Sequence, residues 1–369
     1  IYQTATEFML PLGLGDRLVA TTQFEADPLP SQAEAFAALP EPWERPIPRE
    51  VLLSAKPDFV FAGYETYDLS AERGSATIAD LEAAGARVYI ISGNCAATAT
   101  DVTVESVFTD LRNLGQIFGI ASEAEAIIAE MQAKLSAIKS QIAGQPVPQV
   151  AFLDIGEGGT PVWAYANGIY KDIIARAGGK NIFDDQAEQF VEISSEEVAS
   201  RNPDVFLVVD SPYGAPAAGK LALLYTTFPN APATQNQRSA LILEMNTLPG
   251  VRIVDAVVEL AHILHPDLAA TGVHPAGLGQ RDLPHLFAGH PRAADPGPAR
   301  GALRARPPVA AVDDPFLQRH LRCCRAGAVL GRLAGVRSVV FDKTGTLTPG
   351  RVTVTDVRAV SSPAHPAEA

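Results

Sequence analysis

The first hundred residues alternate short helical patterns with short apolar runs. Thr4 stands three residues before Glu7, and this capping-box spacing predicts a short helix near the start of the chain. Such alternation is typical of a parallel sheet covered by helices. The apolar runs predict strands at residues 17–21, 59–62 and 87–91, and the segments between them predict helices at residues 50–56 and 77–84.

The middle of the chain changes to helical spacing. Val107, Leu111 and Leu114 recur at intervals of three and four, and the same spacing continues to Ile138. We predict one helix over residues 103–143, roughly 60 Å long. Glycines 115 and 119 are its only weak points. A helix of this length is suited to joining two lobes.

The alternation of strands and helices then begins again. We predict strands at residues 150–154 and 205–210 and helices at residues 169–177 and 251–265. One unit occurs on both sides of the long helix: Glu50 is followed by six residues and a Pro-Asp pair that opens a strand, and so is Glu196. This echo predicts two lobes of related structure.

Charge divides the chain near residue 270. Residues 1–270 hold 35 Asp and Glu against 16 Lys and Arg, whereas residues 271–369 hold 7 acidic and 13 basic residues. The acidic first part makes a nucleic acid an unlikely partner. No run of apolar residues is long enough to span a membrane. The chain begins in the middle of an apparent fold, so we expect that an N-terminal segment is missing.

Five segments of the chain follow a recognisable order and spacing: TATEFMLPLGLGDRLVATT, REVLLSAKPDFVFAG, IADLEAAGARVYII, IYKDIIARAGGKNIF and SSEEVASRNPDVFLVVD. They resemble the periplasmic binding proteins of the helical-backbone type, which capture ferric siderophores, haem or cobalamin for ABC importers. The resemblance implies an α/β fold of two Rossmann-like lobes joined by one long backbone helix. We divide the chain into an N-terminal lobe (1–103, its first strand missing), the interlobe helix (104–144), a C-terminal lobe (145–268), a linker (269–334) and a tail (335–369).

The resemblance also implies a function and partners. We expect an extracytoplasmic binding protein rather than an enzyme, which is periplasmic or lipid-anchored, monomeric and without a cofactor, and which delivers a metal chelate to an ABC permease. A ferric siderophore is the leading ligand, with haem and cobalamin as alternatives. One carboxylate per lobe, Glu50 and Glu196, would dock on the permease; Glu197 is an alternative to Glu196. Both glutamates also suit the first turn of a helix, where they stabilise its dipole.

Aromatic and polar residues follow the predicted strands, at the edge where ligands of α/β sheets bind. Flat rings offer a bulky chelate a large contact area, although the same rings can also cap the lobe cores. We expect the chelate to bring its own metal ligands, because His262 and His265 are the only histidines before residue 269 and suit an exposed face of the last helix. The candidate ligand-binding residues are Tyr64, Glu65, Tyr67, Trp163 and Tyr165, with Trp43, Phe190, Asn246 and Arg252 as weaker candidates.

The last hundred residues differ from the rest. Residues 269–334 are rich in Pro, Arg, Ala and His, which predicts a disordered linker or a reading frame that has shifted. Residues 335–357 resemble the phosphorylation site of P-type cation ATPases, in which Asp342 would be the nucleophile. The nucleotide-binding and membrane domains of that family do not follow, so we expect Asp342 to be an inactive remnant. A fragment of a cation-pumping ATPase is the alternative function.

Overall fold

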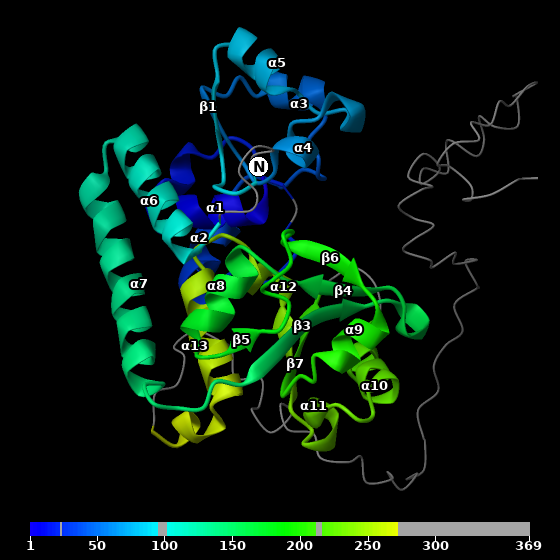
Figure 1. Ribbon diagram of the computed structural model, residues 1–369. Coiled ribbons are helices and arrows are strands. Elements are labelled where there is room, and N and C mark those ends of the chain that lie inside the picture. Colours follow the sequence, from blue (N-terminus) through cyan, green and yellow to red (C-terminus); the bar gives the residue numbers. More distant parts are fainter. Residues whose placement is uncertain (23, 95–101, 212–215, 272–369) are drawn as a thin grey trace, which may run out of the picture. The chain divides into compact units, whose positions relative to one another are not determined.

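The computed structural model describes residues 1–22, 24–94, 102–211 and 216–271 (Figure 1). All of these lie in one compact unit, residues 1–297. A second unit, residues 298–369, lies outside the described residues, as do the P-type motif with Asp342 and almost all of the predicted linker. Within the described residues, no helix is long and apolar enough to cross a membrane.

The N-terminal lobe, residues 1–94, is built around a pair of parallel strands. β1 (Phe59–Ala62) and β2 (Arg87–Ile90) pair in register from Phe59 opposite Arg87. Both strands were predicted from the apolar runs, and their parallel pairing confirms the expected arrangement. The other elements of this lobe are α1 (Gln3–Met9), η1 (Gly15–Arg17), η2 (Pro30–Gln32), α2 (Ala33–Ala37), α3 (Arg49–Ser54), α4 (Glu65–Asp68), η3 (Ala71–Arg73) and α5 (Ile78–Ala83).

Two local predictions at the start of the chain are wrong. Residues 17–21 form no strand: Val19 is 61% exposed, and the only pairing nearby in the described residues is an isolated bridge between Thr22 and Trp43. Thr4 does not cap a helix either, because α1 already begins at Gln3. All seven residues of α1 are buried, and the Thr4 hydroxyl donates to the Met245 sulfur at 3.4 Å. The Thr4 hydroxyl is therefore bonded to a partner in the C-terminal lobe and does not cap the helix.

The connection between the lobes consists of two helices, which corrects the prediction of a single one. α6 (Val104–Phe118) ends at Gly119, whose φ of +71° is left-handed, and α7 (Ala121–Gln141) turns back along it. A Cβ on Gly115 would lie 2.7 Å from the Ala124 Cβ, so the two helices approach closely there. Arg112 and Glu125 join them at 2.8 Å. The pair is seen side by side in Figure 1.

The C-terminal lobe, residues 149–271, contains a mixed sheet. Among the described residues the strand order is β6-β4-β3-β7-β8, and β5 pairs with β3. β3, β5, β7 and β8 run parallel, while β4, which pairs antiparallel with both β3 and the edge strand β6, runs in the opposite direction. The predicted strands are β3 and β7; the patterns of β4, β6 and β8 went unrecognised. The bounds are β3 (Gln149–Ile155), β4 (Val162–Tyr165), β5 (Lys180–Asn181), β6 (Phe190–Ile193), β7 (Val205–Asp210) and β8 (Ser239–Leu243).

Helices cover both faces of this sheet, which confirms the α/β prediction. Val150 and Phe152 of β3 pack into a cluster with α6, α7, α8 and α13, whereas Ala151 and Leu153 face a second cluster with α9, α10 and α11. The first cluster also contains Phe8 and Phe61, so the lobes share a core. The helices and turns of this lobe are η4 (Glu157–Gly159), α8 (Ile169–Arg176), α9 (Ser195–Ser200), α10 (Ala217–Thr227), α11 (Pro232–Gln235), α12 (Glu244–Thr247), α13 (Ile253–Leu264) and η5 (Pro266–Thr271).

The sequence echo corresponds to the same structural unit in both lobes. α3 leads through a turn into β1, and α9 leads through a turn into β7. The residue before each proline is left-handed, with φ of +47° at Lys56 and +53° at Asn202. Glu50 and Glu196 therefore occupy equivalent positions, each in the first turn of its helix.

Candidate functional site

In the N-terminal lobe, three tyrosines gather around one arginine. The Arg45 guanidinium lies 4.0 Å from the ring centre of Tyr2, 4.5 Å from that of Tyr67 and 5.4 Å from that of Tyr64. Tyr2 and Tyr64 meet edge to face at 5.4 Å. β1 ends two residues before Tyr64, so the end of this strand delivers Tyr64 and Tyr67 to the group. We call Tyr2, Tyr64 and Tyr67 the tyrosine group.

Carboxylates fix the position of Arg45. Its Nε and Nη2 donate to the two oxygens of Asp68 at 2.6 and 3.2 Å, and Glu25 lies 3.6 Å away. Burial alone would lower the pKa of Arg45, but the hydrogen bond to Asp68 and the nearby carboxylates outweigh it and raise that pKa. Asp68 also accepts from the backbone N–H of Tyr64 at 2.7 Å. The same carboxylate therefore orients both the arginine and a tyrosine.

In the C-terminal lobe, aromatic rings stack along the paired strands β4 and β6. Trp163 and Phe190 lie 4.8 Å apart with their planes 8° from parallel, and Tyr165 meets Phe190 at 4.9 Å and Tyr170 at 4.8 Å. The register opposes Tyr165 to Phe190 and places Trp163 two residues away on the same face. Phe190 is 42% exposed, whereas Tyr165 is buried. We call Trp163, Tyr165, Tyr170 and Phe190 the stacked group.

Polar side chains gather where parallel strands of this sheet end. Lys220 of α10 is 1% exposed, and its Nζ lies 2.8 Å from Asp154 at the end of β3 and donates to the Val209 carbonyl of β7 at 3.1 Å. Glu244 follows β8 directly and accepts a hydrogen bond from Ser211, which follows β7. Burial raises the pKa of Glu244, and the charges of Glu25 and Asp154 add to this rise.

The tyrosine group packs against the C-terminal lobe. Tyr2 and Tyr64 lie in one apolar cluster with Leu243, Met245 and Leu248, at the end of β8 and in the segment after it. Burial raises the pKa values of these two phenols and of Tyr165 and Tyr170 in the stacked group, which therefore stay protonated and can donate hydrogen bonds.

Some of the predicted ligand-binding residues belong to the two aromatic groups, and others do not. Glu65 follows Tyr64 on α4 and is half-buried, and Trp43 is 46% exposed, with its backbone bridged to Thr22. Among the described residues, the Trp43 ring makes no contact with the rings of the two groups. The structure brings Tyr64 and Tyr67 together around Arg45 in the N-terminal lobe, and Trp163, Tyr165 and Phe190 together in the C-terminal lobe.

Two other candidates, Arg252 and Asn246, take part in a buried hydrogen-bond network that connects the lobes. Arg252 donates to the two oxygens of Glu7 at 2.5 and 2.7 Å and to the Asp27 carbonyl at 2.7 Å. Asn246 lies 3.4 Å from Arg252 and also hydrogen-bonds Glu259. Glu7 is 1% exposed and Arg252 is 5% exposed. This network joins α1 to α13.

Sequence reasoning missed several residues of the region. None of the residues Tyr2, Arg45 and Tyr170 follows a strand. Tyr2 precedes the first helix, Arg45 lies in an irregular segment and Tyr170 lies in α8, so the search at strand ends did not find them. Glu244 could have been found from the rule that ligands bind at the carboxyl ends of parallel strands, had β8 been recognised.

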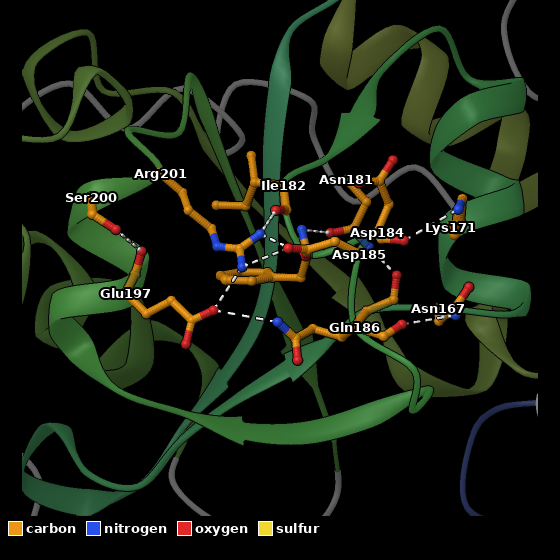
Figure 2. A network of polar contacts seen from close by, with 12 residues as sticks. Asn167, Lys171, Asn181, Ile182, Asp184, Asp185, Gln186, Glu197, Ser200 and Arg201 are labelled. Carbon is orange, nitrogen blue, oxygen red and sulfur yellow. Dashed lines mark hydrogen bonds and ion pairs between the residues drawn. The ribbon is translucent and has the colours of Figure 1, made fainter.

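The proposed docking glutamates are both exposed. Figure 2 shows the contacts of the neighbouring Glu197: Arg201 donates to Glu197 at 2.7 Å, to the two oxygens of Asp185 at 2.7 and 3.0 Å, and to the Ile182 carbonyl. Glu197 is thereby engaged within the lobe. The network also anchors α9 to the segment that leads into β6.

The described residues supply no group of three or more His, Cys, Asp or Glu that could hold a metal ion. His265 is buried rather than exposed, which corrects the expectation for this residue, and burial lowers its pKa. A pocket of about 390 Å³ lies between the first turns of α6 and α8, but none of the predicted binding residues lines it. Its lining residues are Val102, Thr103, Asn167, Gly168, Lys171, Asp172 and Ala175.

Comparison with known proteins identifies the family. The sequence profile described as "Periplasmic binding protein" matches residues 1–239. The chain belongs to this family. As a periplasmic binding protein it is 22% identical over 209 residues to the vitamin B12-binding protein of Photorhabdus laumondii, an alignment covering 56% of this chain and 67% of that protein.

Solved structures of other binding proteins share its fold. One is a periplasmic binding protein from Veillonella parvula, with a TM-score of 0.64 and 23% identity over 72% of this chain and 89% of that chain. Another is from an ABC-type Fe3+-hydroxamate transport system of Saccharomonospora viridis, with a TM-score of 0.59 and 22% identity over 72% of this chain and 91% of that chain. At these identities the likeness shows the fold alone.

Proposed function

We propose that this binding protein captures a ferric siderophore or a related metal chelate outside the cytoplasmic membrane and delivers it to an ABC permease. The observation that carries the proposal is that each lobe presents a group of aromatic rings, with the tyrosine group packed against the C-terminal lobe at the boundary between the lobes. The relatives whose names mention vitamin B12 and Fe3+-hydroxamate support the same class of ligand. The proposal is for a binding role without catalysis.

The chemistry of the two groups suits a bulky chelate. Stacked rings such as Trp163 and Phe190 offer a flat apolar surface that loses little side-chain entropy on binding. Protonated phenols donate hydrogen bonds to the oxygen atoms that chelates display around the metal.

Tryptophan fluorescence tests ligand capture, because the chain has only two tryptophans. Ferrichrome, haemin and cyanocobalamin are titrated into the purified chain and into its Trp43→Phe and Trp163→Phe variants. We expect one of the three to quench the wild type and Trp43→Phe, whose remaining tryptophan belongs to the stacked group, and to quench Trp163→Phe much less. Phe190→Ala is expected to weaken binding about tenfold. No quenching by any of the three ligands overturns the proposal.

We further propose that Glu50 and Glu196 dock on the permease. They lie at equivalent positions of the repeated unit, one in each lobe, and both are exposed. Reversal of either charge, Glu50→Arg or Glu196→Arg, is expected to lower cellular uptake strongly while the affinity for ligand stays unchanged. Glu123→Arg is the matched control, since Glu123 is an exposed first-turn glutamate of α7 outside the repeated unit. Equal loss of uptake in the control would refute docking at these positions.

A further inference from the structure

We propose that the site selects chelates by charge, accepting neutral or cationic complexes and rejecting polyanionic ones, with Glu244 as the residue that sets this preference. The inference rests on the proposed function and narrows its substrate class. The charge preference follows from the ion pairs near the aromatic groups: the buried cations there are paired with carboxylates, whereas Glu244 is not paired with a cation of the described residues.

The buried cation of the tyrosine group is not available to an anionic ligand. Arg45 is held by both oxygens of Asp68, has Glu25 at 3.6 Å, and lies against three tyrosine rings. A ligand carboxylate or catecholate would have to displace Asp68, whose side chain is 1% exposed, and would leave that carboxylate buried without a partner.

The cation of the C-terminal lobe is likewise engaged. Lys220 is 1% exposed and lies 2.8 Å from Asp154, whose side chain is 27% exposed. The carboxylate thus lies on the solvent side of the pair, and the ammonium group lies beneath it. A ligand that approaches the strand ends meets Asp154 before Lys220.

Among the described residues, Glu244 is the carboxylate of this region that forms no ion pair. No Lys or Arg lies within 4 Å of it in the part of the chain that the structure describes, its hydrogen-bond partner is the neutral Ser211, and the nearby cation Lys220 is paired with Asp154. Its chain neighbours Leu243 and Met245 pack with Tyr2 and Tyr64, so Glu244 lies beside the tyrosine group at the boundary between the lobes.

The remaining surroundings favour the same sign of ligand charge. The faces of aromatic rings carry negative partial charge and attract cations. Arg73, which stacks on Tyr67 at 4.2 Å, is exposed to solvent and follows Glu72 directly, so counter-ions and water screen its charge. The polar environment of the site is therefore net negative where it is least hydrated.

Siderophore classes differ in the charge that this environment would meet. Three hydroxamates each lose one proton and balance ferric iron, which gives a neutral complex. Three catecholates each lose two protons and leave a trianion. Because the Coulomb energy scales with the product of the charges, the trianion would be repelled by Glu244 three times as strongly as a monocation is attracted. The site is therefore suited to tris-hydroxamates or other uncharged chelates.

The test compares ligands of different charge on the full chain. Ferrioxamine B is a cationic ferric tris-hydroxamate, ferrichrome and cyanocobalamin are neutral, and ferric enterobactin is a trianion. We expect a neutral or cationic ligand to bind at least about 100-fold more tightly than the trianion. Glu244→Gln is expected to narrow this ratio about tenfold or more, whereas Glu244→Asp keeps it. Glu130→Gln, which removes an equal charge from the exposed face of α7, should leave the ratio unchanged.

The outcomes separate this inference from the proposed function. Binding of the trianion as tightly as the neutral ligands, or a ratio that Glu244→Gln does not alter, overturns charge selection while capture of a chelate still stands. Failure of all four ligands to bind overturns both. Circular dichroism of each variant checks that it is folded, and the neutral ligand serves as the internal reference because its affinity should change little.

Discussion

Removal of Arg252 should destabilise the whole fold far more than removal of a comparable cation at the surface. Arg252 is 5% exposed and donates to both oxygens of Glu7, to the Asp27 carbonyl and towards Asn246. Arg252→Met leaves the Glu7 carboxylate buried without a counter-charge, which costs about 3–5 kcal/mol. This is a large share of the about 5–15 kcal/mol that stabilises an ordinary folded protein. Urea unfolding followed by circular dichroism measures the loss.

Lys134→Met is the matched control. Lys134 of α7 also pairs with a carboxylate at 2.9 Å, that of Asp255 on α13, but both side chains are about one-third exposed. Its loss should cost at most about 1 kcal/mol. The double variant Glu7→Met with Arg252→Met should be less destabilised than the sum of its single variants by at least about 2 kcal/mol. If Arg252→Met cost no more than Lys134→Met, burial would not govern the strength of this ion pair and the reasoning would fail.

Three further outcomes are expected. Gly119→Ala should lower the free energy of unfolding by about 1 kcal/mol and Gly119→Asn by less, measured in urea, because φ is +71° at this position; equal effects would contradict the backbone argument. Burial raises the pKa of Glu259 from 4.5 to about 7, so the free energy of unfolding should fall by up to about 3 kcal/mol as pH rises from 4.5 to 7. In urea titrations at a series of pH values, Glu259→Gln should make this fall smaller. An unchanged dependence on pH would refute the assignment to Glu259. Incubation with labelled ATP and Mg²⁺ should leave Asp342 unlabelled, whereas a hydroxylamine-sensitive label that Asp342→Asn removes would favour the ATPase alternative.

Local patterns predicted the elements whose signal lies within a few neighbouring residues. β1 and β7 have the predicted bounds, since each is a short apolar run opened by a Pro-Asp pair. The capping box at Thr77 and Asp80 lies at the start of a predicted helix. The equivalence of Glu50 and Glu196 came from sequence spacing, and the left-handed residues Lys56 and Asn202 give it a structural basis.

The errors arose where distant contacts decide the structure. The apolar spacing continues through Gly119 because α6 and α7 both face the same core, so periodicity could not reveal the turn between them. Arg252 was a candidate ligand-binding residue, and its ion pair with Glu7 was not foreseen because Glu7 lies 245 residues away in the sequence. Tyr2 and Arg45 join the tyrosine group only after the chain has folded around β1. None of these contacts could be predicted from the pattern of neighbouring residues.

The link between α1 and α13 has a consequence for the order of events during synthesis. Glu7 emerges from the ribosome early, but the arginine that neutralises it follows 245 residues later. Until then the first helix holds a carboxylate that cannot be buried at low cost, so the nascent chain gains little from folding early. The buried pair that joins α1 to α13 can therefore form only after α13 has been synthesised.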